Sequence, residues 1–93
     1  MSSEARDYQR ESELRRKYSM GLRDYEVMLS DQNYRCAICQ RHIDAVGKLY
    51  IDHDHRTNRV RALLCQGCNF GLGFFKDNPR LLAAALVYLE DYS

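Results

Sequence analysis

The sequence predicts a small α+β domain held together by a bound zinc ion, and three observations support this. The chain has 93 residues, so its apolar core is too limited to be comfortably stable alone. Its four cysteines, Cys36, Cys39, Cys65 and Cys68, form two Cys-x-x-Cys pairs, which is typical of a tetrahedral zinc site rather than a disulfide framework. Two short strand-like runs lie between the pairs, and helical patterns flank them.

The N-terminal third is expected to be helical. Residues 4–18 contain neither Gly nor Pro and place Glu four residues before Arg or Lys, but their apolar face is thin. We therefore divide the chain into an N-terminal helical arm, 1–19, and a zinc-stapled domain, 20–93. A second helix is expected from Leu22 to about Gln32, with Gly21 at its N-cap. Its apolar stripe comprises Leu22, Tyr25, Val27, Met28 and Leu29.

Shorter elements are expected from Cys36 onward. A polar loop runs through Gly47 and is followed by a strand at about 49–53, a turn near residues 57 and 58, and a second strand at 60–64. These two strands predict a β-hairpin. His42 is expected to be a surface histidine, since four thiols already complete a zinc coordination sphere.

Two helical segments are expected after the second cysteine pair. The stretch NFGLGFF is a weak helix former that needs tertiary support, and Gly71 and Gly73 within it are expected to be close-packing positions. Asn78 and Pro79 make a good N-cap and first residue for a helix from Pro79 to about Asp91. Its core candidates are Leu81, Leu82, Ala85, Leu86 and Leu89.

The stretch LYIDHDH, which ends at His55, concentrates two aspartates and two histidines. Strand alternation would place the aspartates on one face and the histidines on the other, so a site that uses both Asp52 and His53 needs the strand to end, bulge or twist there. Phosphodiester hydrolysis requires a base, a hard divalent cation and a hydrogen-bond donor. Histidine suits the base, and carboxylate and amide oxygens suit magnesium.

Charge is distributed unevenly along the chain. The net charge of +1 is uninformative, but the segment around LYIDHDH is locally basic, and its candidate DNA-binding residues are Lys48, Arg56, Arg59 and Arg61. No apolar stretch approaches the length of about 18 residues that a membrane span needs. We expect a cytoplasmic protein without a membrane partner.

The order Cys36-x-x-Cys39, then Asp52-His53-Asp54-His55, then Cys65-x-x-Cys68-Asn69 resembles the recombination endonuclease VII family, a branch of the HNH or ββα-metal nucleases. The resemblance extends over about residues 22–89. It implies a ββα-metal (HNH) core with flanking helices, a structural Zn²⁺ held by the four cysteines, and one catalytic divalent ion, Mg²⁺ or Mn²⁺.

The resemblance also implies roles for individual residues. Asp52 and Asn69 would hold the catalytic ion, His53 would be the general base, and His55 would contact the scissile phosphate. Because Asn69 directly follows Cys68, the zinc site would fix where its amide points. Asp54 is expected to orient the loop or a basic side chain.

The favoured function is a DNA endonuclease that nicks or cleaves double-stranded DNA with weak specificity by a one-metal mechanism. Two alternatives remain open for the interaction with DNA: a zinc-ribbon module that binds nucleic acid without cutting it, and a dimeric endonuclease that resolves DNA junctions. A purely structural zinc protein with its Leu-rich helix as a subunit interface is a third. The protein is expected to be encoded by a phage or prophage and to be a monomer or a homodimer. Packaging or recombination proteins are possible partners.

Overall fold

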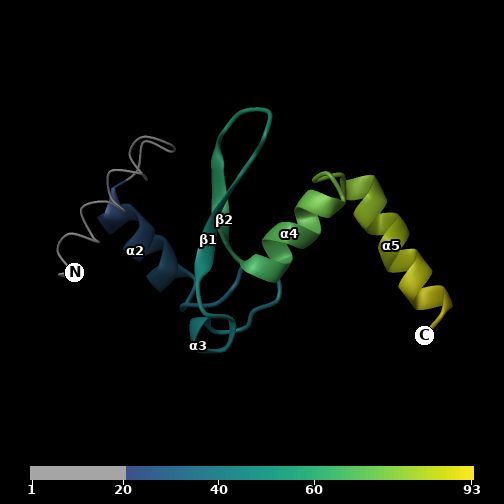
Figure 1. Ribbon diagram of the computed structural model, residues 1–93, viewed down its shortest axis with the longest axis horizontal. Coiled ribbons are helices and arrows are strands. Elements are labelled where there is room, and N and C mark those ends of the chain that lie inside the picture. The colour runs from purple at the N-terminus through teal and green to yellow at the C-terminus, as the bar shows by residue number, and fades with distance from the viewer. Residues whose placement is uncertain (1–20) are drawn as a thin grey trace.

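A computed structural model describes residues 21–93, so the predicted arm 1–19 lies outside the described residues. The elements in chain order are α2 (Leu22–Asp31), α3 (Ile43–Val46), β1 (Leu49–His53), β2 (Val60–Cys65), α4 (Gln66–Phe74) and α5 (Pro79–Asp91) (Figure 1). The two strands form an antiparallel hairpin, and α4 follows β2 without a linker. This ββα unit confirms the predicted α+β class.

Helix α2 is joined to the hairpin by a buried tyrosine. Gly21 is its N-cap, as expected, and the backbone N–H of Gly21 donates to the carboxylate of Asp24 at 2.9 Å. Tyr25 is buried, and its hydroxyl donates a hydrogen bond to the carbonyl of Leu49. The predicted stripe is wrong for Val27, which is exposed, because a residue two positions after Tyr25 lies on the opposite side of the helix.

The buried core lies where α2, the first cysteine turn and the hairpin meet. Its members are Tyr25, Cys36, Leu49, Leu63, Leu64 and Cys65. Gln32 joins α2 to β2 through its side-chain amide. The backbone N–H of Leu63 donates to Gln32 Oε1 at 2.9 Å, and Gln32 Nε2 donates to the Leu63 carbonyl at 3.0 Å. The amide thus satisfies backbone groups that a neighbouring strand would otherwise pair.

The hairpin is irregular beside the LYIDHDH motif. Ile51 pairs with Leu63, whereas His53 pairs with Val60. Asp52 therefore stands opposite two residues of β2, which is the arrangement of a β-bulge. The strand also ends at His53, so the break in alternation that a site using Asp52 and His53 requires is confirmed.

The segment before β1 differs from the predicted polar loop. It contains the single-turn helix α3, and His42 caps it: the backbone N–H of Asp44 donates to His42 Nδ1 at 3.0 Å. A backbone bridge also pairs His42 with Arg35. His42, whose side chain is 36% exposed, therefore also has a structural role that the sequence did not predict: it caps α3. A neutral ring nitrogen can accept this hydrogen bond in place of the usual capping oxygen.

Helix α4 packs against both strands through Leu72 and Cys68. Cys65 is its N-cap, with Sγ accepting a hydrogen bond from the backbone N–H of Cys68 at 3.4 Å. The expectation that Gly71 and Gly73 are close-packing positions is wrong. A Cβ at either position would meet no atom within 4 Å.

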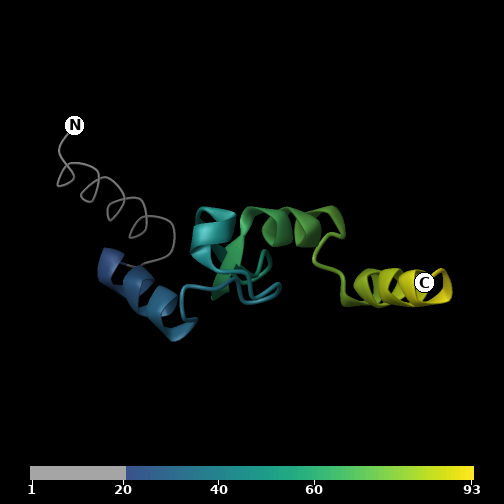
Figure 2. The same cartoon turned by 90° about the horizontal axis from the view of Figure 1, so that it is seen from below.

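Helix α5 begins as predicted, with Asn78 Oδ1 accepting from the backbone N–H of Arg80 at 2.9 Å and with Pro79 in the first turn. It then extends away from the hairpin (Figures 1 and 2). Within residues 21–93, no helix is long and apolar enough to cross a bilayer.

The predicted burial of α5 is wrong for three of its five core candidates. Leu81, Leu86 and Leu89 are exposed, the last two by 58% and 64%, while Leu82 and Ala85 are half-buried. The physical reason is the direction of α5, which runs away from the hairpin rather than over it (Figures 1 and 2).

Candidate active site

The four cysteines converge although 25 residues separate the two pairs. Their sulfur atoms all lie within 4.8 Å of one another. Cys36 and Cys65 are buried, and each Sγ accepts a backbone N–H at 3.4 Å, from Ile38 and from Cys68 respectively. The two pairs therefore form two similar turns whose sulfurs point at one centre.

Electrostatics within this cluster favour a bound cation. A hydrogen bond from the Arg41 side chain lowers the pKa of Cys39 to about 6. Burial, together with a hydrogen bond to Cys65, raises the pKa of Cys68 to about 12. Neighbouring thiolates repel one another, so all four can ionise only when a cation compensates their charge. Four converging sulfur donors fit a tetrahedral zinc ion.

Asp52 lies at the bulge of the hairpin and is only 8% exposed. Both of its carboxylate oxygens accept hydrogen bonds from Arg61: Nε lies 2.6 Å from Oδ2, and Nη2 lies 3.0 Å from Oδ1. This bidentate contact raises the pKa of Arg61. The bulge explains the pairing, since Arg61 is one of the two residues opposite Asp52.

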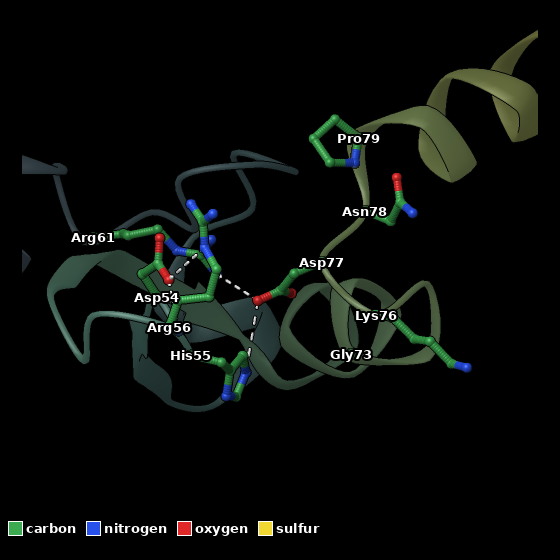
Figure 3. A pocket seen from close by; sticks show the side chains of 9 residues that line it. All are labelled: Asp54, His55, Arg56, Arg61, Gly73, Lys76, Asp77, Asn78 and Pro79. Atoms are coloured by element: carbon green, nitrogen blue, oxygen red, sulfur yellow. Dashed lines mark hydrogen bonds and ion pairs between the residues drawn. The ribbon is translucent and has the colours of Figure 1, made fainter.

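A second carboxylate, Asp77, shares the same guanidinium. Arg61 Nη2 lies 3.2 Å from Asp77 Oδ2, and His55 Nε2 lies 3.6 Å from that same oxygen (Figure 3). Asp77 belongs to the turn between α4 and α5. Sequence reasoning missed it, although it is the single acidic residue between Asp54 and Glu90. Its position as a lone acidic residue in a long stretch is the sequence signal that could have identified it.

The two histidines of the motif lie side by side. The ring centroids of His53 and His55 are 4.7 Å apart; His53 is half-buried and His55 is exposed. Asp54 orients the following turn, as expected, because its Oδ1 accepts the backbone N–H of Arg56 at 2.8 Å and of Thr57 at 3.4 Å. The hydrogen bond from Arg56 lowers the pKa of Asp54.

A pocket of about 750 Å³ opens beside these residues. The β1–β2 loop contributes Asp54, His55 and Arg56 to its wall, Arg61 comes from β2, and the α4–α5 turn forms the other side (Figure 3). The pocket thus brings three of the predicted site residues together with Asp77.

The remaining predicted residues lie around this region at different places. Asn69 is half-buried in α4, which packs against β1 and β2. Arg59 is exposed in the β1–β2 loop. Lys48 precedes β1, and its Nζ lies 5.0 Å from the centre of the Tyr50 ring, so Lys48 stands at the end of the strand away from His53.

Comparison with known proteins finds a similar solved structure and similar phage proteins. A crystal structure of the ββα-Me type II restriction endonuclease Hpy99I matches with a TM-score of 0.56 and 40% sequence identity, over 62% of this chain and 32% of that one.

Among curated proteins, the gene 59 proteins of two mycobacteriophages are similar to this chain. That of Mycobacterium phage D29 is 39% identical over 74 residues, which is 78% of this chain and 45% of the relative. That of Mycobacterium phage L5 is 40% identical over 67 residues, which is 71% of this chain and 41% of the relative. The chain thus spans less than half the length of the curated relatives that it matches.

The model of the recombination endonuclease VII family matches residues 11–91. This match covers the cysteine cluster, the bulged hairpin with its Asp-His-Asp-His motif, and α4. The chain therefore belongs to the recombination endonuclease VII family, with the ββα core of the ββα-Me endonucleases.

Proposed function

We propose that this chain is a metal-dependent DNA endonuclease that nicks or cleaves double-stranded DNA with weak sequence specificity. The observation that carries the proposal is the placement of Asp52, a buried carboxylate, directly before His53 at the bulged end of β1. Carboxylate oxygens are ligands that Mg²⁺ prefers, although a cation at Asp52 must compete with Arg61. The neighbouring imidazole is the side chain best suited to proton transfer near neutral pH.

In the proposed reaction, neutral His53 accepts a proton from a water molecule as the water oxygen attacks phosphorus and the bond from phosphorus to the 3′ oxygen breaks. His55, adjacent and exposed, donates a hydrogen bond to a phosphate oxygen. Asp52 and Asn69 would hold Mg²⁺ or Mn²⁺, whose charge would stabilise the developing negative charge on the phosphate and the leaving oxygen.

DNA binding is proposed to use the basic side chains around the motif. Arg56 and Arg59 are exposed on the β1–β2 loop next to His55, which suits contacts with the phosphates flanking the cleaved bond. Lys48 would contact the backbone further along the duplex. These contacts predict binding that weakens steeply with salt.

The cysteine cluster is proposed to hold zinc in a structural role. Cys68 and Asn69 are consecutive residues of α4, so a zinc ion anchored by the thiolates would fix the rotation of the helix. That fixation would hold the Asn69 amide in one orientation. DNA cleavage would then depend on the rigidity of the cysteine cluster, but the zinc ion itself would take no part in the reaction.

A plasmid-nicking assay tests this function. Purified, zinc-replete protein is incubated with supercoiled DNA and Mg²⁺, Mn²⁺ or EDTA. We expect nicking that EDTA abolishes, and a loss of about 10²- to 10⁴-fold in rate for His53→Ala. His42→Ala is the matched control, since it removes a histidine that caps α3. Undiminished nicking by a folded His53→Ala variant would contradict the proposal.

The same assay separates the alternatives. Salt-dependent DNA binding without cleavage in any metal would favour the zinc-ribbon binding module. Paired cuts confined to four-way-junction DNA would favour a junction-resolving dimer, for which the exposed apolar side chains of α5 offer a surface. Because the chain is similar to phage proteins, we propose phage recombination or packaging proteins as partners to test.

A further inference from the structure

We propose that Arg61 is a positioning residue that controls the access of a divalent cation to Asp52, and that Asp77 retains Arg61 when the cation displaces it. This inference rests on the proposed function, because it takes Asp52 to be a cation ligand. It assigns to Arg61 a role beyond the phosphate contact that the basic character of its segment suggests.

The first support is that Arg61 engages both oxygens of Asp52. The two contacts, at 2.6 Å and 3.0 Å, form the fork that makes guanidinium–carboxylate pairs strong. Asp52 is otherwise buried. A cation that binds Asp52 must therefore compete with Arg61 for the oxygens, and its measured affinity is reduced by the strength of this pair.

The second support is that one nitrogen of Arg61 contacts both carboxylates. Arg61 Nη2 lies 3.0 Å from Asp52 Oδ1 and 3.2 Å from Asp77 Oδ2. When Arg61 leaves Asp52, a rotation of its side chain can keep the second contact, so the guanidinium charge is not left without a partner. The Arg61 side chain is 38% exposed and borders the pocket (Figure 3), which gives it space to rotate.

The third support is that Asp77 is well anchored. Lys76 and Asp77 both have left-handed backbone, with φ of 56° and 53°, a conformation that non-glycine residues seldom adopt. The N–H of Asp77 donates to the carbonyl of Leu72 at 2.8 Å, and its carboxylate also contacts His55. The turn thus presents a fixed carboxylate to Arg61 from the far side of the pocket.

A consequence is coupling between DNA and the cation. A phosphate that attracts Arg61 would release Asp52, so DNA would raise the affinity for the cation and the cation would raise the affinity for DNA by the same factor.

Binding of Mn²⁺ to the zinc-loaded 93-residue protein without DNA tests the proposal, measured by electron paramagnetic resonance or calorimetry. Arg61→Gln is expected to bind Mn²⁺ about two- to fivefold more tightly than the wild type, the effect of removing one partly exposed ion pair. Arg61→Lys, which keeps the charge but loses the fork, is expected to fall between the two, and it serves if Arg61→Gln does not fold.

Lys76→Gln is the matched control. It removes one positive charge from the same pocket, but its side chain points away from Arg61 (Figure 3), so its Mn²⁺ affinity should equal that of the wild type. An equal gain in Lys76→Gln and Arg61→Gln would overturn the proposal, because the effect would then be one of net charge. Unchanged or weaker Mn²⁺ binding in the Arg61 variants would overturn it as well.

Asp52→Asn distinguishes failure of this inference from failure of the proposed function. Loss of Mn²⁺ binding in Asp52→Asn, without a gain in the Arg61 variants, overturns the role of Arg61 alone. Retained Mn²⁺ binding in Asp52→Asn removes the ligand role of Asp52, on which both proposals depend.

A double-mutant cycle tests the part assigned to Asp77. Asp77→Asn should weaken the second contact of Arg61, hold the guanidinium on Asp52 and lower the Mn²⁺ affinity. In the Arg61→Gln background, the same change should have little effect. An equal loss in both backgrounds would show that Asp77 acts only through its charge and would overturn its role as a second acceptor.

Discussion

The hairpin and the terminal helix α5 have similarly apolar sequences, but their apolar side chains are buried to very different extents. Leu63 in β2 is 0% exposed, whereas Leu86 in α5 is 58% exposed. The end of the hairpin that contains Leu49 and Leu63 packs against α2, α4 and the cysteine cluster, while α5 extends away from them (Figure 1). The difference teaches that an apolar stripe identifies a face to be covered, but covering it also requires an element that arrives from elsewhere in the chain.

The largest expected effect is loss of the zinc ion that the cysteine cluster is proposed to bind. Replacing Cys36 by Ser should abolish zinc binding and unfold the hairpin, because zinc can contribute about 10 kcal/mol to the folding of so small a domain. Atomic absorption reports the zinc content, and circular dichroism reports the fold. Leu86→Ala should keep its zinc. A cooperatively folded, zinc-free Cys36→Ser protein would show that the apolar core suffices.

A pair of leucine truncations compares the two regions directly. Leu63→Ala should lower the free energy of unfolding by about 2–5 kcal/mol, the usual cost of a cavity at a buried site. Leu86→Ala should change it by less than about 0.5 kcal/mol, as at other exposed positions. Chemical denaturation of the zinc-loaded proteins measures both. A cost for Leu86→Ala that approached that of Leu63→Ala would mean that α5 is covered in solution.

A smaller effect is expected where α2 joins β2. Gln32→Ala should lower the free energy of unfolding by about 1–3 kcal/mol, because it leaves the backbone N–H of Leu63 without its partner. Gln66→Ala, at an exposed position of α4, is the control for loss of a glutamine. Denaturation curves that coincide for the two variants would contradict a stabilising role for the Gln32 amide.

The smallest effect should be a gain in stability. Gly71→Ala should stabilise the protein by up to about 1 kcal/mol, since Ala favours a helix interior over Gly and the new Cβ meets no atom within 4 Å. Thermal unfolding measures the gain, with zinc content as the control. A lower melting temperature would indicate that α4 is packed more tightly than this clearance allows.

Much of the fold follows from local signals in the sequence. The strand at 49–53, the Asn78 and Pro79 helix start, and the two cysteine pairs each depend on neighbouring residues, and the structure confirms them. Alternation alone separates Asp52 from His53, so the sequence predicts that the strand ends, bulges or twists at the motif. The structure has both a bulge and the strand end there.

The features that sequence reasoning missed depend on long-range pairing. The Gln32 amide meets Leu63 across 31 residues, and Asp77 reaches Arg61 across 16. The hydrophobic periodicity of the sequence cannot predict such contacts, because each depends on how separate elements pack against one another. The direction of α5 was missed for the same reason. The catalytic and metal-binding roles of the site residues stay predictions that the assays above test.

Cys65 has three structural roles: it ends β2, caps α4 and contributes a sulfur to the cysteine cluster. Inserting or deleting even one amino acid there would rotate the helix by about 100° and shift it by about 1.5 Å, which would misplace Cys68 and Asn69 together. Evolutionary changes in chain length are therefore expected beyond α5, where neither the sulfurs nor the helix phase depend on spacing.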